Sequence, residues 1–287
     1  MSDKPIPPHG DFFTIPGWSV VDLRGPDAMR FAQAQFMSDV VALPAGHWQW
    51  SGWLTPKGRL VALFALVRLD DTSLLLLLAD AEPQAFAAAL SRFVFRSKVS
   101  IVVDDGSRVS GAFMASAAAR GAAVARDAEG GLELDFGTAQ DGRTLRIGAT
   151  AALQDDRLAA EWRARDLAHG LPRLGTDHAG QWTPQQLSLE RLRAYSVRKG
   201  CYPGQEIVAR THFLGQAKRG LQRLRADAAM PSGDVVAMDA PDRTLGRVVS
   251  IAGREGLAVM PLEAGAGPFA VDGIRCCPLP LLDGLAR

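Results

Sequence analysis

The residues of this sequence with the clearest chemical potential surround Cys201, in the run from Arg198 to Gly204 that reads Arg-Lys-Gly-Cys-Tyr-Pro-Gly. A cysteine acts as a nucleophile or metal ligand through its thiolate, and nearby cations or free N–H groups at a helix start lower the thiol pKa. Arg198 and Lys199 come just before Cys201, and Gln205 to Thr211 fits either a helix start or an apolar strand. The glycines of the run leave space for another molecule to approach the sulfur. Two interpretations stay open: a reactive or ligand-contacting thiol on a rigid loop, and a buried structural cysteine beside solvated cations.

The composition is that of a folded globular protein without a global positive field. The 287 residues are 47% hydrophobic and 22% charged, which excludes disorder as the main character. Because 32 basic and 31 acidic side chains give a net charge of +1, we predict no direct nucleic-acid binding. The longest leucine run, Leu74–Leu78, is far shorter than a membrane span, and no apolar signal segment is visible. Three cysteines, an odd number, do not suit a disulfide framework. We therefore predict a cytoplasmic protein without membrane contact.

Common motifs of hydrolases and metal sites are absent. The sequence has no G-x-G-x-x-G, P-loop, H-E-x-x-H, G-x-S-x-G or C-x-x-C, and its five histidines lack metal-ligand spacing. Cys276 and Cys277 are adjacent in a predicted strand, so their side chains would point to opposite faces. Since an iron–sulfur cluster usually needs about four thiolates, we predict neither a metal site nor an autonomous cluster site.

Hydrophobic periodicity predicts the elements that must position these residues. The N-terminal part combines strands and helices in an α+β order rather than repeating βαβ units. After an irregular segment over residues 1–20, we predict helices over Gly25–Met37 and from Glu82, and strands around Trp48–Trp50, Arg59–Leu69, Thr72–Ala79 and Val99–Val103.

Residues 111–150 give only weak strand signals. They are followed by predicted helices over Gln154–Ala168 and Thr183–Leu192. Beyond Gly220, five short strand candidates predict a small β-barrel or sandwich: Leu221–Arg225, Val235–Met238, Leu245–Ile251, Leu257–Pro261 and Ala270–Cys276. We assign an N-terminal α+β lobe over 1–105, a second α+β lobe over 106–219 and a C-terminal β-barrel over 220–287, with the first two lobes able to interleave.

The run from Lys199 to Arg210, K-G-C-Y-P-G-Q-E-I-V-A-R, resembles the signature of the YgfZ family. These are folate-binding proteins related to the aminomethyltransferase (T protein) of the glycine cleavage system. Phe31–Val40 is similar to the F-x-Q-G-Q-x-T-x-D-V segment of this superfamily, with Ala34 in place of the usual glycine. Lys57-Gly58-Arg59 looks like its K-G-R turn. The resemblance extends over most of the chain through weaker matches at Gly170-Leu-Pro172, Thr183-Pro-Gln185 and Thr244–Val249.

The resemblance implies a three-lobed aminomethyltransferase-like fold around a channel that holds tetrahydrofolate or a derivative. It also implies a role in the assembly or repair of iron–sulfur enzymes. In the aminomethyltransferase, the catalytic aspartate follows shortly after the K-G-R turn, whereas this chain continues as Leu60 to Phe64 with no carboxylate before Asp70. The pterin-contacting glutamate of the superfamily would fall near Ala168, beside His169. These departures favour an accessory protein over a transferase.

Besides Cys201, eight residues are candidates for folate contact or for shaping the site: Gln35, Asp39, Trp53, Lys57, Arg59, Lys199, Gln205 and Glu206. Trp53, with Trp48 and Trp50, could stack on a flat pterin or belong to the core. Lys57 and Arg59 could meet the glutamate tail of a folate or an acidic partner, or form a solvated turn. Gln35 and Asp39 share a helix face and could line the channel or cap a loop. Lys199, Gln205 and Glu206 would hold the cysteine loop in shape.

A local basic cluster follows the cysteine motif at Arg210, His212 and Lys218-Arg219. It is either a solvated face or a docking site for a partner.

The leading hypothesis is a cytoplasmic, tetrahydrofolate-binding accessory protein for iron–sulfur enzymes, with Cys201 as its functional thiol. Its partners would be iron–sulfur client proteins or assembly factors. The rival hypothesis is a tetrahydrofolate-dependent aminomethyl or methyl transferase, which would make the chain a one-carbon enzyme. A third hypothesis is a docking module that has lost its ligand.

Overall fold

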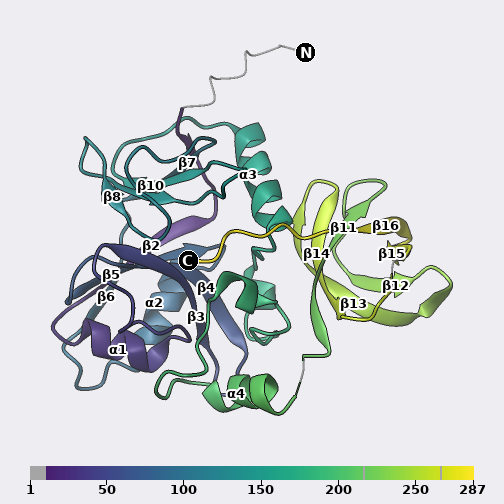
Figure 1. Cartoon of the computed structure of the whole chain (residues 1–287), viewed down its shortest axis with the longest axis horizontal. Coiled ribbons are helices and arrows are strands. Elements are labelled where there is room, and N and C mark those ends of the chain that lie inside the picture. The colour runs from purple at the N-terminus through teal and green to yellow at the C-terminus, as the bar shows by residue number, and fades with distance from the viewer. Residues whose placement is uncertain (1–10, 216, 266) are drawn as a thin grey trace.

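Two antiparallel β-sheets and a closed β-barrel make up the computed structural model, which describes residues 11–215, 217–265 and 267–287 (Figure 1). The barrel lies to one side of the two sheets, and helix α3 runs between the second sheet and the barrel (Figure 1).

The first sheet has apolar side chains on both faces because both faces are covered. Its strands lie in the order β3 (His47–Leu54), β4 (Leu60–Arg68), β5 (Ser73–Ala79), β2 (Trp18–Arg24) and β6 (Ser100–Val103). Helices α1 (Ala28–Gln35) and α2 (Pro83–Ser91) pack on one face, and the other face joins the central core. This double burial explains the uninterrupted leucine run of β5, since a strand covered on only one face alternates apolar and polar residues.

The prediction of an irregular segment over residues 1–20 is wrong at β1 (Phe13–Thr14), which pairs with a strand of the second sheet, and again from Trp18 onward, where β2 begins between β5 and β6. Ser19 and Asp22 interrupt the apolar pattern of this strand, so its sequence signal is weak. Residues 1–10 of the predicted segment lie outside the described residues.

The second sheet combines the start of the chain with its middle. Its strands lie in the order β1 (Phe13–Thr14), β7 (Arg108–Ala112), β10 (Thr144–Gly148), β9 (Leu132–Asp135) and β8 (Ala125–Arg126). Strand β1 pairs with β7 although about a hundred residues separate them along the chain. Helix α3 (Asp156–Ala168) follows, and the Asp155 carboxylate caps it by accepting bonds from two backbone N–H groups of the first turn.

The segment after α3 contains two short 3₁₀ helices, η1 (Thr176–His178) and η2 (Leu189–Leu192), and helix α4 (Gln205–Phe213). The predicted helix over Thr183–Leu192 is wrong: only its last turn is helical. Ser188 and Arg193 flank that turn in the left-handed backbone region, with φ of 49° and 54°, which an α-helix cannot contain.

The barrel closes with six strands rather than five. They are β11 (Arg219–Ala226), β12 (Asp234–Ala237), β13 (Ala240–Ala252), β14 (Glu255–Pro261), β15 (Phe269–Val271) and β16 (Ile274–Leu279). The last predicted strand is divided into β15 and β16 by a hairpin turn at Asp272-Gly273, where both residues have positive φ. Cys276 faces the barrel core and Cys277 is half-buried, so the two thiols do point apart as predicted.

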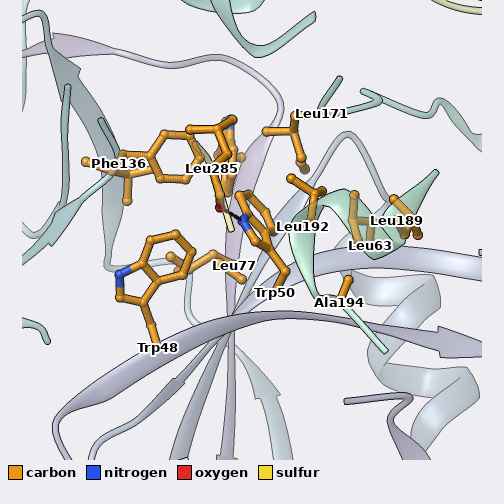
Figure 2. Packing of buried hydrophobic residues seen from close by; sticks show 14 of the residues in the cluster. Trp48, Trp50, Leu63, Leu77, Phe136, Leu171, Leu189, Leu192, Ala194 and Leu285 are labelled. Carbon is orange, nitrogen blue, oxygen red and sulfur yellow. Dashed lines mark hydrogen bonds between the residues drawn. The ribbon is translucent and has the colours of Figure 1, made fainter. Parts of the chain in front are cut away.

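The residues after β16 return from the barrel to the core between the two sheets (Figure 1). Leu285 is buried beside Trp50, and the Trp50 indole Nε1 donates a hydrogen bond of 2.7 Å to the Leu285 carbonyl oxygen (Figure 2). The Trp48 ring stacks on Phe136, with centroids 5.8 Å apart. Trp48 and Trp50 are therefore core residues that join the lobes.

Candidate functional site

Lys199 anchors the cysteine loop (residues 198–204) to the end of helix α1. Its buried ammonium Nζ donates to the carbonyl oxygens of Gln33, Phe36 and Ser38 at 2.6, 2.6 and 2.8 Å. A cation suits this position because the last carbonyl groups of a helix lack partners and carry partial negative charge. Burial lowers the pKa of Lys199 to about 8, and the nearby Asp39 carboxylate partly opposes that shift.

Two further contacts fix the course of the loop. The Gln205 amide Nε2 donates to the Lys199 carbonyl oxygen at 3.2 Å, and the Tyr202 hydroxyl donates to the Ser196 carbonyl oxygen at 3.1 Å. The Lys199 ammonium lies 5.0 Å from the centre of the Tyr202 ring, and burial raises the pKa of Tyr202 to about 12. The loop is thus held from several sides.

Two glycines let the cysteine loop touch the turn after β3. Gly204 has a φ of +79°, and a Cβ at this position would lie 2.6 Å from both the Gly58 Cα and the Thr55 carbonyl oxygen. A Cβ on Gly58 would in turn lie 2.8 Å from the Ile207 Cβ. The K-G-R turn and the cysteine motif both carry the family resemblance and are far apart in sequence. In the fold, their backbones are in direct contact.

This arrangement leaves Cys201 exposed, which excludes the buried structural cysteine. Arg198, Gly200 and Glu206 are also exposed, and no atom lies within 4 Å of a Cβ built on Gly200. The described residues contain no group of three or more His, Cys, Asp or Glu side chains that could hold a metal ion. Cys201 is open to another molecule from the solvent side.

The prediction that Gln35 and Asp39 share a helix face is wrong, because α1 ends at Gln35 and Asp39 lies in the turn beyond it. The Asp39 carboxylate accepts bonds from the Gln33 amide Nε2 at 3.1 Å and the Ala42 backbone N–H at 3.4 Å, so it shapes the turn after the helix. Gln35 is half-buried, and its Oε1 finds no hydrogen-bond donor within the described residues.

Lys57 and Arg59 lie on the turn against the cysteine loop. Lys57 is exposed, whereas the Arg59 guanidinium Nη1 donates to the Gln181 carbonyl oxygen at 2.6 Å and to the Gln186 Oε1 at 3.4 Å. Arg59 thereby ties the turn to the segment that follows η1.

An apolar pocket of about 270 Å³ lies between the first sheet, α2 and the segment from Pro172 to Ala179. Its walls include Trp53, Leu63 and Phe86. Trp53 is the predicted site residue that lines it; the other eight, all within the described chain, do not. Among the described lining residues, Glu82 carries the one carboxylate, and that carboxylate caps α2 by accepting bonds from two backbone N–H groups.

A polar pocket of about 330 Å³ adjoins the apolar pocket at Gly175 and opens between α3 and the barrel. Its charged lining consists of two arginines and two aspartates, with His178 beside them: Arg163, Arg173, Asp80 and Asp177. Together the two pockets join an apolar end to an end with side chains of both charges.

Arg173 joins all three parts of the molecule at the wall of the polar pocket. Its guanidinium donates to the Asp80 carboxylate at 2.7 and 3.1 Å and to the Asp166 carboxylate at 3.1 Å. Its backbone N–H donates to the Ser250 Oγ of the barrel at 3.2 Å. Arg163 also contacts Asp80, at 2.9 Å from each carboxylate oxygen. Most of the positive charge is therefore already paired.

Ala168 and His169, at the position expected for a pterin-contacting glutamate, line a different pocket of about 630 Å³ together with the C-terminal segment. His169 is buried, its ring Nδ1 lies 2.9 Å from the Asp283 carbonyl oxygen, and burial lowers its pKa. The structure therefore does not bring these two residues to the apolar pocket.

The sequence, the barrel and the fold of this chain each resemble those of known proteins. The tRNA-modifying protein YgfZ of Edwardsiella ictaluri (strain 93-146) is 30% identical to this chain over 234 residues, covering 74% of this chain and 70% of the relative. The chain belongs to the YgfZ family. The tRNA-modifying protein YgfZ of Serratia proteamaculans (strain 568) is 29% identical over 236 residues, covering 75% of this chain and 71% of the relative.

The YgfZ-family chain also matches a family model described as the CAF17 C-terminal β-barrel domain, over residues 218–280. Its fold is similar to that of the glycine cleavage system aminomethyltransferase T from Bartonella henselae, with a TM-score of 0.69 at 15% identity. That match covers 94% of this chain and 85% of the transferase. The predicted aminomethyltransferase-like α+β fold with a terminal barrel is confirmed.

The sequence analysis did not identify Asp80, which lines the polar pocket, or the segment from Pro172 to Ala179, which lines both pockets. The available signal was Asp80 itself, a carboxylate placed directly after the apolar strand β5, with Ala79 and Ala81 in the wall beside it. In the described part of this YgfZ-family chain, no helix is both long and apolar enough to cross a lipid bilayer.

Proposed function

We propose that this YgfZ-family protein binds tetrahydrofolate or a derivative and supports the assembly or repair of iron–sulfur enzymes, with Cys201 as its functional thiol. The observation that carries the proposal is the apolar pocket, which faces β4 at the position where the sequence lacks the carboxylate expected of a transferase. Family membership and the exposed cysteine loop add support.

The residues of the apolar pocket fit a ligand with a flat ring. Trp53, Phe86 and Leu174 offer apolar walls to a ring, and pockets of a few hundred Å³ are usual for small ligands. An anionic tail that reached the polar pocket would compete with Asp80 for the Arg163 guanidinium, so the ring contributes more support to the proposal than the tail. When bound, tetrahydrofolate would supply a carrier for one-carbon groups. Lys57 and Arg59, our sequence-based candidates for the tail, line neither pocket.

The alternative function, a folate-dependent aminomethyl or methyl transferase, is favoured by the aminomethyltransferase-like fold. It requires a group that can steer a proton or an amine beside the ring. Strand β4 supplies Val61, Ala62 and Leu63 to the pocket, and none of these side chains can hold a proton. We therefore place the transferase second.

The name of the relatives, tRNA-modifying protein YgfZ, suggests one class of client. We propose that the client is an iron–sulfur enzyme that modifies tRNA, and that this chain acts on the enzyme rather than on tRNA. The net charge of +1 argues against a general RNA-binding surface. Three free cysteines agree with a reducing cytoplasm as the location.

Calorimetric titration with tetrahydrofolate under anaerobic conditions tests the pocket, using a matched pair of variants. Ala89→Trp fills the pocket from α2, whereas Ala88→Trp adds the same bulk to an exposed position of the same helix that does not line it. We expect saturable one-to-one binding that Ala89→Trp abolishes and Ala88→Trp retains. Equal binding by both variants would show that folate lies elsewhere, and no binding by the unmodified protein would favour the docking module.

Complementation of a deletion strain tests the thiol. We expect Cys201→Ser to lose support of iron–sulfur enzyme activity and of tRNA modification, while Cys277→Ser, on the barrel, retains both. Full activity of Cys201→Ser would end the thiol proposal. Turnover of a methylamine substrate by the purified protein with tetrahydrofolate would instead establish the transferase.

A further inference from the structure

Helix α4 and its surroundings expose large apolar side chains that the fold does not use. Phe213 is 66% exposed, Leu214 85% and Leu262 60%. A groove of about 520 Å³ opens beside them, lined by residues that include Tyr195, Thr211, His212 and Leu262. Contiguous apolar groups of this kind on a protein surface usually mark a contact with another molecule.

The same surface carries four cations without an ion-pair partner among the described residues. Arg193, Arg198, Arg210 and Lys218 are all exposed, and none forms an ion pair with a carboxylate of the described chain. Arg193 lines the groove, which also contains the Glu190 carboxylate, and the Lys218 carbonyl oxygen accepts a hydrogen bond from the Leu262 backbone N–H, which places Lys218 at the rim. Exposed arginines such as Arg92 are unpaired as well within the part of the chain that the structure describes, so this surface is distinguished by a groove that adjoins both its cations and its apolar side chains.

We propose that this surface, the α4 face, binds an acidic protein segment that inserts a bulky apolar side chain into the groove. The α4 face is defined by Arg193, Arg198, Arg210, Phe213, Leu214 and Leu262. In a protein interface, buried apolar side chains supply most of the affinity, and the charges around them supply specificity. Cys201, on the loop before α4, would then lie beside the bound partner. This inference rests on the proposed function in one respect only: the proposed function identifies the partner as an iron–sulfur protein.

The chemistry of the α4 face argues against two other occupants, a nucleic acid and a second copy of this chain. A nucleic acid would leave the exposed side chains of Phe213 and Leu214 without apolar partners, since its binding is dominated by phosphate contacts. A second copy related by a two-fold axis would place the same cations against one another, because such an interface pairs a surface with itself. An acidic partner satisfies the cations and the apolar side chains together.

A photo-crosslinking amino acid at Leu214 in the full-length protein, activated in living cells, tests the proposal. We expect a protease-sensitive adduct whose yield falls about tenfold when Arg210→Glu is added, since reversing a contact charge weakens an electrostatically guided complex. Arg92→Glu, which alters an exposed arginine on α2, is the matched control and should leave the yield unchanged. Phe213→Ser should reduce the yield, and Phe95→Ser, at an 86% exposed phenylalanine, should not.

Several results would overturn the proposal: no adduct, an adduct that Arg210→Glu does not reduce, an RNase-sensitive adduct, or an adduct with the mass of two copies. These readouts do not depend on folate or on iron–sulfur enzyme activity. The experiment can therefore distinguish failure of the docking proposal from failure of the proposed function.

Discussion

Replacing Lys199 by methionine tests whether the buried ammonium holds the cysteine loop to α1. Methionine preserves the apolar stem but leaves the three carbonyl oxygens at the end of α1 without their donor. Hydrogen bonds from a charged donor are worth about 1.5–3 kcal/mol each. The variant also avoids burying a charge, which costs about 3 kcal/mol here because each unit of lowered pKa corresponds to about 1.4 kcal/mol. We expect a net loss of about 3 kcal/mol in the free energy of unfolding, measured by urea denaturation at neutral pH.

The pH dependence of this loss gives an independent check. The pKa of Lys199 is about 8 in the folded chain, below its ordinary value of 10.5, so the unfolded chain binds the proton more tightly. The free energy of unfolding should therefore rise with pH between about 8 and 10.5 for the unmodified protein, relative to Lys199→Met. The exposed Arg198→Met is the control and should change stability by less than about 0.5 kcal/mol. A Lys199→Met variant as stable as this control, or a stability difference that does not grow with pH, would refute the reasoning.

Three further substitutions probe other contacts. Gly204→Ala should destabilise the protein by about 2–4 kcal/mol, because its left-handed backbone and the adjacent turn leave no room for a Cβ, whereas Gly200→Ala should be neutral; urea denaturation of the pair decides. Leu285→Ala should cost about 2–4 kcal/mol and lower the melting temperature, while the half-exposed Leu282→Ala should not, and equal effects would contradict the anchoring of the C-terminal segment. Arg173→Met should cost about 3 kcal/mol, since it removes the shared partner of the buried Asp166 carboxylate and the partly buried Asp80 carboxylate. An Arg173→Met protein with unchanged urea midpoint would show that the remaining arginines suffice.

The fold class followed from the sequence because its strongest signals are local. The apolar run of β5 and the glycine that follows α3 each depend on neighbouring residues. Strand β2 and the divided strand at Asp272-Gly273 were missed because polar residues interrupt the first and a two-residue turn hides in the second. The structure has a short 3₁₀ turn at Leu189–Leu192 where the sequence predicts a longer helix. Both residues that flank the turn have positive φ, and hydrophobic periodicity does not report backbone dihedral angles.

The candidate site was predictable only in part, for a related reason. The cysteine loop could be found because its glycines and charges are contiguous in sequence. The burial of the Lys199 ammonium under α1 could not, since a lysine before a cysteine reads equally well as a solvated cation. The apolar pocket is built from β4, α2 and the segment from Pro172 to Ala179, and only the fold brings these together. Alanines and a proline at a pocket wall carry no chemical signal of their own.

The contact between Trp50 and Leu285 has a consequence for synthesis on the ribosome. The two residues are 235 positions apart, so at about 5–20 residues per second the tryptophan waits roughly 12–47 s for its partner to be made. Until then, the Leu285 side chain does not fill the apolar space between the sheets, and the Trp50 indole N–H lacks its acceptor, the Leu285 carbonyl oxygen (Figure 2). A nascent chain of this protein should therefore be a client for chaperones that bind exposed tryptophan and leucine, and release should coincide with emergence of Leu285.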